Sequence, residues 1–154
     1  MRRTDRERDE AFALAVVDKC EYAVLAMAST EGDPLCLPVT IVRSGSAIYF
    51  HSAMEGEKVA WLRRNPRVCM SCVGDTEILP QDFTTAYESA VVKGTAEEVT
   101  EEGEKIEALR LLCQRHAASA MDKFDGAIAR SLHRTGIWKI TIREITGKAK
   151  VKKA

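Results

Sequence analysis

The sequence contains no long apolar run and no excess of charge of one sign. Its longest apolar stretch, near Ala23–Ala28, is far shorter than the ~20 residues that a membrane-spanning helix needs. Lysine plus arginine number 23, and aspartate plus glutamate also number 23. A nucleic-acid-binding protein usually carries a basic excess, which is missing here. We therefore expect no membrane span and no nucleic-acid partner.

Several catalytic and targeting signatures are absent as well. The chain has no Gly-x-Ser-x-Gly nucleophile elbow and no Gly-x-x-x-x-Gly-Lys phosphate loop. The charged N-terminus lacks an apolar segment, so we expect no secretory signal. Five cysteines, an odd number, then indicate reduced thiols and a cytoplasmic location. Cys69-x-x-Cys72 falls in a predicted strand, where residues three apart face opposite sides, and this predicts core thiols rather than zinc ligands.

The overall composition is that of a folded protein. Hydrophobic residues make up 45% of the chain and charged residues 30%, which predicts one domain spanning residues 1–154. The charges are uneven: residues 97–107 are acidic, and both ends are basic, through Arg2, Arg3, Arg6 and Arg8 and through Lys148, Lys150, Lys152 and Lys153. We interpret these runs as solvated ends and a solvated helix face.

Most of the chain has the pattern of short strands joined by hairpins. Strands are predicted at residues 22–29, 35–43, 47–52, 67–73, 84–93, 95–99 and 137–145, with a hinge at Gly94 and a loop over 74–82. This order favours an antiparallel sheet or barrel over a doubly wound fold.

Four helices are predicted between these strands. Thr4-x-x-Glu7 and Ser52-x-x-Glu55 have the capping-box pattern, so we expect helices to follow them, the second ending near Asn65-Pro66. Thr100 is the expected cap of a helix that reaches Ala117. A further helical stripe from Met121 to Leu132 ends before Gly136.

The segment Tyr49–Lys58 is the most informative for function. A strand that ends in His51-Ser52 is followed at once by a helix, whose N-terminus presents unpaired N–H groups and a partial positive charge. Gly56 allows close approach, and Lys58 can add a full charge to a phosphate. The pattern is compatible with a phosphate site, and equally with a capped surface helix carrying an ordinary lysine.

This segment, continued through Arg63-Arg64-Asn65-Pro66-Arg67-Val68, resembles the FMN-binding split-barrel superfamily typified by pyridoxamine phosphate oxidase. The resemblance is greater to its short nitroimidazole-resistance-type branch. Further stretches agree in order: Met1-Arg2-Arg3-x-Asp5-Arg6, Leu37-Pro38-Val39-Thr40, Tyr87-x-Ser89-x-Val91-Val92-x-Gly94 and Ile145-Thr146-Gly147-Lys148. The resemblance implies a mainly β fold with α-helices: a six-stranded antiparallel Greek-key split β-barrel that forms a homodimer with FMN at the subunit interface.

The resemblance also implies a set of cofactor-binding residues. His51, Ser52 and Lys58 would hold the phosphate, with Gly56 at the helix start. The isoalloxazine ring would lie along Val39 and Thr40. Ser89 would reach the flavin, and Trp138 would approach the flavin of the partner subunit. The chain lacks the C-terminal Arg-x-His pair with which pyridoxamine phosphate oxidases bind substrate, so the resemblance does not extend to that conversion.

The function expected from this resemblance is flavin-mediated reduction of a small substrate, such as a nitro-aromatic compound, with a reduced nicotinamide as electron donor. No side chain need act as catalytic acid or base, because the cofactor carries the electron or hydride transfer. Three alternatives stay open: a non-enzymatic flavin or haem protein, in which His51 could be a haem ligand; a deazaflavin-dependent reductase; and a dimerisation module without a cofactor.

Overall fold

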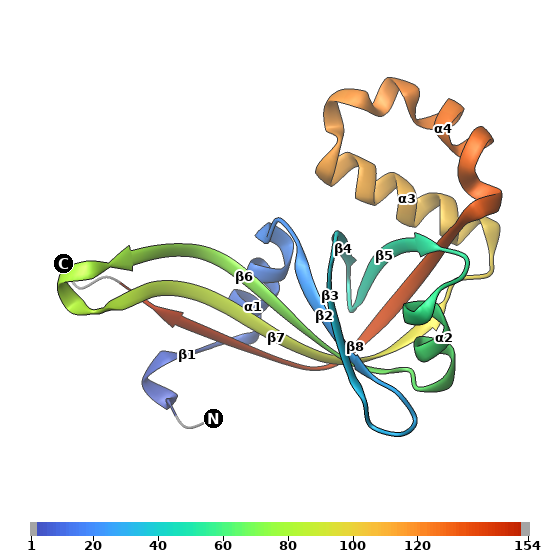
Figure 1. Ribbon diagram of the computed structural model, residues 1–154. Coiled ribbons are helices and arrows are strands. Elements are labelled where there is room, and N and C mark those ends of the chain that lie inside the picture. The colour runs from blue at the N-terminus through green and yellow to red at the C-terminus, as the bar shows by residue number, and fades with distance from the viewer. Residues whose placement is uncertain (1–2, 152–154) are drawn as a thin grey trace.

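The computed structural model describes residues 3–151 and is shown in Figure 1. Arg2, Lys152 and Lys153 of the basic ends lie outside this range. Four α-helices and eight strands are described: α1 (Glu10–Lys19), α2 (Glu57–Arg64), α3 (Glu102–His116) and α4 (Phe124–Ser131), with β1 (Glu7–Arg8), β2 (Ala23–Ala28), β3 (Pro34–Val39), β4 (Ile41–Ser44), β5 (Ala47–Ala53), β6 (Arg67–Leu79), β7 (Thr84–Glu98) and β8 (Thr135–Lys150). Short 3-10 turns stand at Thr4–Arg6, Pro80–Asp82, Ala118–Lys123 and Leu132–Arg134.

The strands form one antiparallel sheet in the order β3-β2-β6-β7-β8-β5-β4, and β1 adds to β8. The two end strands, β3 and β4, are consecutive in the chain and are separated only by Thr40. One stretch of chain therefore supplies both edges of the sheet, which curls it into a barrel. The predicted mainly β class is confirmed. Eight strands are described rather than six, for two reasons. The stretch that begins at Pro34 pairs with β2 before Thr40 and with β5 after it, so it counts as two strands, and β1 is an added short strand.

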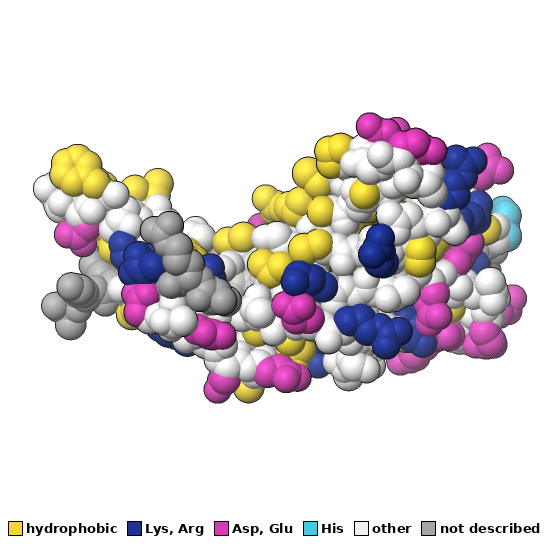
Figure 2. Space-filling view, turned by 90° about the horizontal axis from the view of Figure 1, so that it is seen from below, with side chains coloured by type: hydrophobic (Ala, Val, Ile, Leu, Met, Phe, Trp, Pro, Cys, Tyr) yellow, Lys and Arg dark blue, Asp and Glu magenta, His cyan; other side chains and the backbone are white. Residues whose placement is uncertain are grey.

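Strands β6, β7 and β8 are much longer than the others and continue beyond the barrel as an arm, drawn at the left of Figure 1 and seen in space-filling form at the left of Figure 2. Strand β6 bends where its register with β7 shifts, between Val73 and Thr76. The loop predicted for residues 74–82 is therefore wrong as far as Leu79: the ladder to β7 continues to that residue, and the turn follows at Pro80–Asp82. Phe83 at the tip has φ +48° and is 97% exposed.

Three helix starts differ from those predicted. Helix α1 is capped by Asp9, whose carboxylate accepts from the Phe12 N–H at 2.8 Å, so the Thr4 box is not used. Helix α2 starts after Gly56 rather than Ser52, because Ser52 is still paired in β5. Helix α3 is capped by the Glu101 side chain and not by Thr100.

The main core fills the barrel. Side chains alternate between the inside and the outside of each strand, and the inner set includes Leu25, Ile48, Phe50, Met70 and Trp138, all at most 2% exposed. Helix α1 packs on the barrel through Ala13, which lies against Gly147 of β8. Helices α3 and α4 lie together at the opposite end of the molecule from the arm tip (Figure 1).

Candidate functional site

The junction between β5 and α2 has the geometry of an anion site. Strand β5 ends at Ala53, and Gly56 forms the N-cap of α2 with φ +125°, a value that favours glycine. No side chain caps this helix. The first N–H groups of a helix lack intrahelical partners, so those of α2 are free to bind an anion.

Lys58 lies in the first turn of α2 and is partly buried. Its ammonium lies 5.4 Å from the centre of the Phe50 ring, so the aromatic face of a core residue supports it. Burial lowers the pKa of Lys58. No carboxylate among residues 3–151 forms an ion pair with this lysine. An anionic ligand would therefore meet a positive charge that the protein leaves uncompensated.

His51 lies on the exposed side of β5 and within electrostatic reach of Lys58. Partial desolvation of the imidazole and the positive charge of Lys58 both lower the pKa of His51. Two basic groups thus converge beside the start of α2, and the charge of Lys58 disfavours protonation of His51. A bound phosphate would relieve that repulsion.

Ser52 occupies the next position and faces the other side of the strand, where it is 8% exposed. Its hydroxyl donates to the Ala53 carbonyl oxygen at 2.6 Å. Gly136 of β8 is its cross-strand partner, and a Cβ added there would lie 2.9 Å from Ser52 Oγ. Ser52 could donate to a phosphate only after giving up the bond to Ala53.

Val39 and Thr40 lie at the corner where the chain passes from β3 to β4. Ile41 pairs with Phe50 across the β4–β5 ladder, and Thr40 and His51 adjoin this pair at the same end. Val39 is 7% exposed, whereas Thr40 is partly exposed. The predicted ring-binding corner and the predicted phosphate residues are therefore neighbours on the barrel.

The two remaining predicted residues lie elsewhere. Ser89 is partly exposed on β7, opposite Val73 and Lys148, at the base of the arm. Trp138 is 2% exposed inside the barrel, opposite Phe50. Its Nε1 is the one buried side-chain donor or acceptor among residues 3–151 that lacks a partner. The predicted contact of Trp138 with a partner's flavin stays a prediction.

Two residues important to this site were not predicted. Phe50 supports Lys58, and Gly136 makes room for Ser52. The sequence pattern assigned no role in this site to Phe50 and indicated Gly136 only as the end of a helical stripe. The pairing of β5 with β8 could have indicated both roles, but these strands are far apart in sequence.

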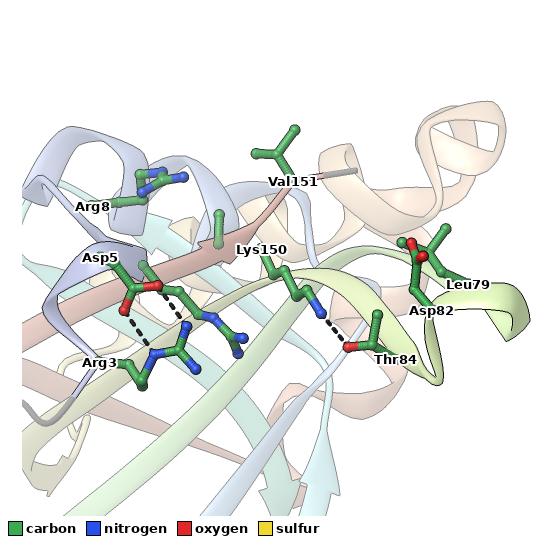
Figure 3. A pocket seen from close by; sticks show the side chains of 10 residues that line it. Arg3, Asp5, Arg8, Leu79, Asp82, Thr84, Lys150 and Val151 are labelled. Atoms are coloured by element: carbon green, nitrogen blue, oxygen red, sulfur yellow. Dashed lines mark hydrogen bonds and ion pairs between the residues drawn. The ribbon is translucent and has the colours of Figure 1, made fainter. Parts of the chain in front are cut away.

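A separate hollow of about 510 Å³ lies between the N-terminal segment and the hairpin of the arm, as Figure 3 shows. Arg3 donates to Asp5 at 2.6 and 2.7 Å, and Lys150 donates to the hydroxyl of Thr84. It is lined by none of the predicted site residues. Four of its polar side chains pair with one another, and none of the predicted cofactor residues lies there, so we do not assign it to cofactor binding.

Comparison with known proteins identifies the family. A family model described as pyridoxamine 5'-phosphate oxidase matches residues 8–149. The chain belongs to this family. The match includes the β5–α2 junction and the corner at Thr40, so the residues described above lie in the part of the chain shared with other family members. No curated protein matches the sequence significantly.

Solved structures share the family fold at low sequence identity. A protein from Bacteroides thetaiotaomicron, proposed to confer 5-nitroimidazole antibiotic resistance, is 24% identical and covers 92% of this chain and 84% of its own, with a TM-score of 0.76. The flavocytochrome Anf3 from Azotobacter vinelandii is 20% identical, with coverages of 99% and 72% and a TM-score of 0.82. An FAD-binding protein from Mesorhizobium loti is 22% identical, with coverages of 95% and 98% and a TM-score of 0.70.

Two further observations bear on the remaining sequence predictions. No helix within residues 3–151 is long and apolar enough to cross a membrane. All five cysteines are free thiols. Cys72 is buried inside the barrel and Cys69 lies partly exposed on its outside, so the prediction that they face opposite sides of a strand is confirmed. The prediction that both are core thiols is wrong for Cys69, because the outward side of β6 at this position is open.

Proposed function

We propose that the protein binds FMN through the β5–α2 junction. The observation that carries the proposal is the convergence of Lys58 and His51 on the helix N-terminus that no side chain caps. The phosphate would be bound by the ammonium of Lys58, the imidazole of His51 and the free N–H groups after Gly56. Ser52 would join them once its hydroxyl turns away from Ala53.

The ring of the flavin would lie against the corner at Val39 and Thr40, which adjoins His51 across the β4–β5 ladder. This corner is on the barrel surface, so a single protomer would leave the ring largely uncovered. We propose that a second copy completes the site in a homodimer, with Ser89 as a contact to the flavin. Trp138, which lies inside the barrel, would have to turn outward to make the contact that the family resemblance implies. Val73 and Val91, exposed apolar residues near Ser89, support such a pairing.

The proposed activity is reduction of a small substrate, for which nitro-aromatic compounds are the first class to test. Bound flavin would supply hydride or electron transfer, and a reduced nicotinamide would be the electron donor. The side chains described here would bind and orient the cofactor and hold its phosphate. We propose a cytoplasmic location, which the five free thiols support.

The decisive experiment is an absorption spectrum of the purified protein before and after adding FMN, followed by dialysis. We expect flavin bands that survive dialysis. A protein that releases all FMN would contradict the proposed cofactor. Parallel additions of haem and of a deazaflavin test the alternatives, since either one retained in place of FMN would reassign the site.

A second measurement separates an enzyme from a flavin carrier. We expect the flavin-loaded protein to oxidise reduced nicotinamide faster when a nitro-aromatic acceptor is present. A protein that retains FMN but shows no turnover with any acceptor would be a storage or relay protein, with the cofactor assignment intact.

A further inference from the structure

The outer face of the barrel carries a second concave surface, beyond the C-terminal end of α2. It encloses about 650 Å³ and lies over β2, β6, β7 and β8. Its floor is a row of residues paired across these four strands: Ala26 with Cys69, Cys69 with Lys93, and Lys93 with Glu144. Ala28 and Gly94 also line it. The row spans about 14 Å at the ordinary spacing of strands. Its β2 and β6 end carries small side chains that leave a flat floor, and its β7 and β8 end carries the charged pair Lys93 and Glu144.

A β-bulge directs an arginine into this surface. Lys93 pairs with Glu144 and Gly94 with Ile142, so Arg143 has no partner on β7. Bulges turn a side chain away from the regular alternation and are frequent beside functional sites. Arg143 and Glu144 are consecutive yet both exposed, and both line the hollow.

The positive charge at this surface is not compensated. Arg67, the first residue of β6, and Arg143 both line the hollow. Neither guanidinium has a hydrogen bond or an ion pair with any residue between 3 and 151. Lys93 is paired with Glu144 at 3.1 Å. Two free guanidinium groups therefore border a floor whose apolar part is Ala26, Ala28, Cys69 and Gly94.

We infer that this surface binds a planar aromatic anion, with its ring on the floor of small side chains and its carboxylate or phosphate on Arg67 and Arg143. Guanidinium groups bind such oxyanions in a bidentate manner and stack on aromatic rings. The volume lies within the range of small-molecule sites.

The inference does not depend on the proposed flavin. The cofactor residues gather at the N-terminal end of α2, whereas Arg67 follows its C-terminal end. Eight helical residues separate the two places by about 12 Å. The two sites can therefore be tested one at a time in the same protein.

The test uses the full chain as purified, with 2-naphthoate as probe and the neutral 2-naphthamide as its matched control. In ¹H–¹⁵N spectra we expect 2-naphthoate to shift the amide signals of Ala26, Cys69 and Gly94. The neutral 2-naphthamide should bind more weakly than 2-naphthoate by at least about ten-fold, because it lacks the negative charge. Shifts confined to other residues, or equal binding of the two probes, would overturn the inference.

Variants of the two arginines test whether their positive charge binds the carboxylate of the probe. Arg143→Gln and Arg67→Gln should each weaken 2-naphthoate binding about ten-fold. Arg130→Gln, an exposed arginine on α4, should leave it unchanged. Circular dichroism checks folding, which exposed substitutions should preserve. If both Arg67→Gln and Arg143→Gln bind 2-naphthoate as tightly as the parent, the two arginines do not bind its carboxylate and the inference is refuted.

A second copy of the chain is the competing occupant. A soluble gadolinium chelate should broaden the amide signals of Ala26 and Cys69 if the surface is open to solvent. Protection of these signals, together with dissociation of a dimer in Arg143→Gln, would show that a partner subunit covers the surface and would overturn the small-molecule site.

Discussion

Helix α2 has a candidate binding site at each end, and the two are built in different ways. At its N-terminal end, free backbone N–H groups and the nearby Lys58 and His51 come from one continuous segment. At its C-terminal end, Arg67 and Arg143 are brought together by the sheet from strands that are distant in sequence. A site made by one segment can be recognised in a sequence, whereas a site made by strand register appears only in the folded structure.

The largest effect on ligand affinity should come from the site at the N-terminal end of α2. Lys58→Ala removes the partly buried ammonium over Phe50, and we expect FMN affinity to fall by about 1.5–3 kcal/mol, the contribution of a charge-assisted hydrogen bond. Fluorescence titration with FMN measures this affinity. Binding of 2-naphthoate should not change, and Lys123→Ala, an exposed lysine, serves as control. Equal FMN affinity in parent and variant would remove Lys58 from the proposed site.

The next effect concerns the bulge. A Cβ at Gly94 would lie 2.5 Å from the Thr141 carbonyl oxygen, so Gly94→Ala should force β7 and β8 apart and lower the free energy of unfolding by about 2 kcal/mol. Urea denaturation checks this. Gly126→Ala in α4 meets only the end of the Arg130 side chain, and there the helix should become slightly more stable. If Gly94→Ala loses 2-naphthoate binding and Gly126→Ala keeps it, the site at the C-terminal end of α2 depends on the register between β7 and β8.

The smallest effect is a pH dependence of the N-terminal site. The pKa of His51 is lowered in the folded, cofactor-free protein, first by desolvation and then by Lys58. Protonation therefore disfavours folding, and stability should fall as the pH drops below about 6.5, the ordinary histidine value. His51→Gln should flatten this slope in urea denaturation between pH 5 and 7.5. An unchanged slope would mean that another group titrates.

FMN should reverse the sign of this dependence, because a phosphate beside His51 favours the charged imidazole. We therefore expect FMN to stabilise the parent protein more strongly, relative to His51→Gln, as the pH falls toward 6. Thermal unfolding with and without FMN gives the comparison. A stabilisation by FMN that is equal in both proteins across this range would place His51 outside the phosphate site.

How much could be predicted from the sequence follows the same division between local and distant contacts. The alternation of residues and the run Tyr49–Lys58 predicted the mainly β class and the β5–α2 junction, because both depend on neighbours in the chain. The helix caps were misplaced because Thr4, Ser52 and Thr100 have suitable side chains, but Ser52 is held in the β5 ladder, and Asp9 and Glu101 cap the helices instead.

The arm and the bulge could not be predicted for a physical reason. Residues 74–77, Gly-Asp-Thr-Glu, have a loop-like composition. The ladder to β7, which resumes at Thr76 and runs to Leu79, continues the strand through this segment. Arg143 stands within an alternating strand pattern, and nothing local indicates that β8 slips by one residue against Gly94. Both features depend on cross-strand pairing.

The position of β8 has a consequence for folding. This strand lies between β7 and β5, yet it is the last strand in the chain. The hairpins β2–β3, β4–β5 and β6–β7 join nearby segments and can form while the chain is being synthesised. The ladder from β5 to β8 spans most of the sequence and carries a high loop-closure cost. Within residues 3–151, the part formed by β3, β2, β6 and β7 and the part formed by β5 and β4 therefore share backbone pairing only through β8.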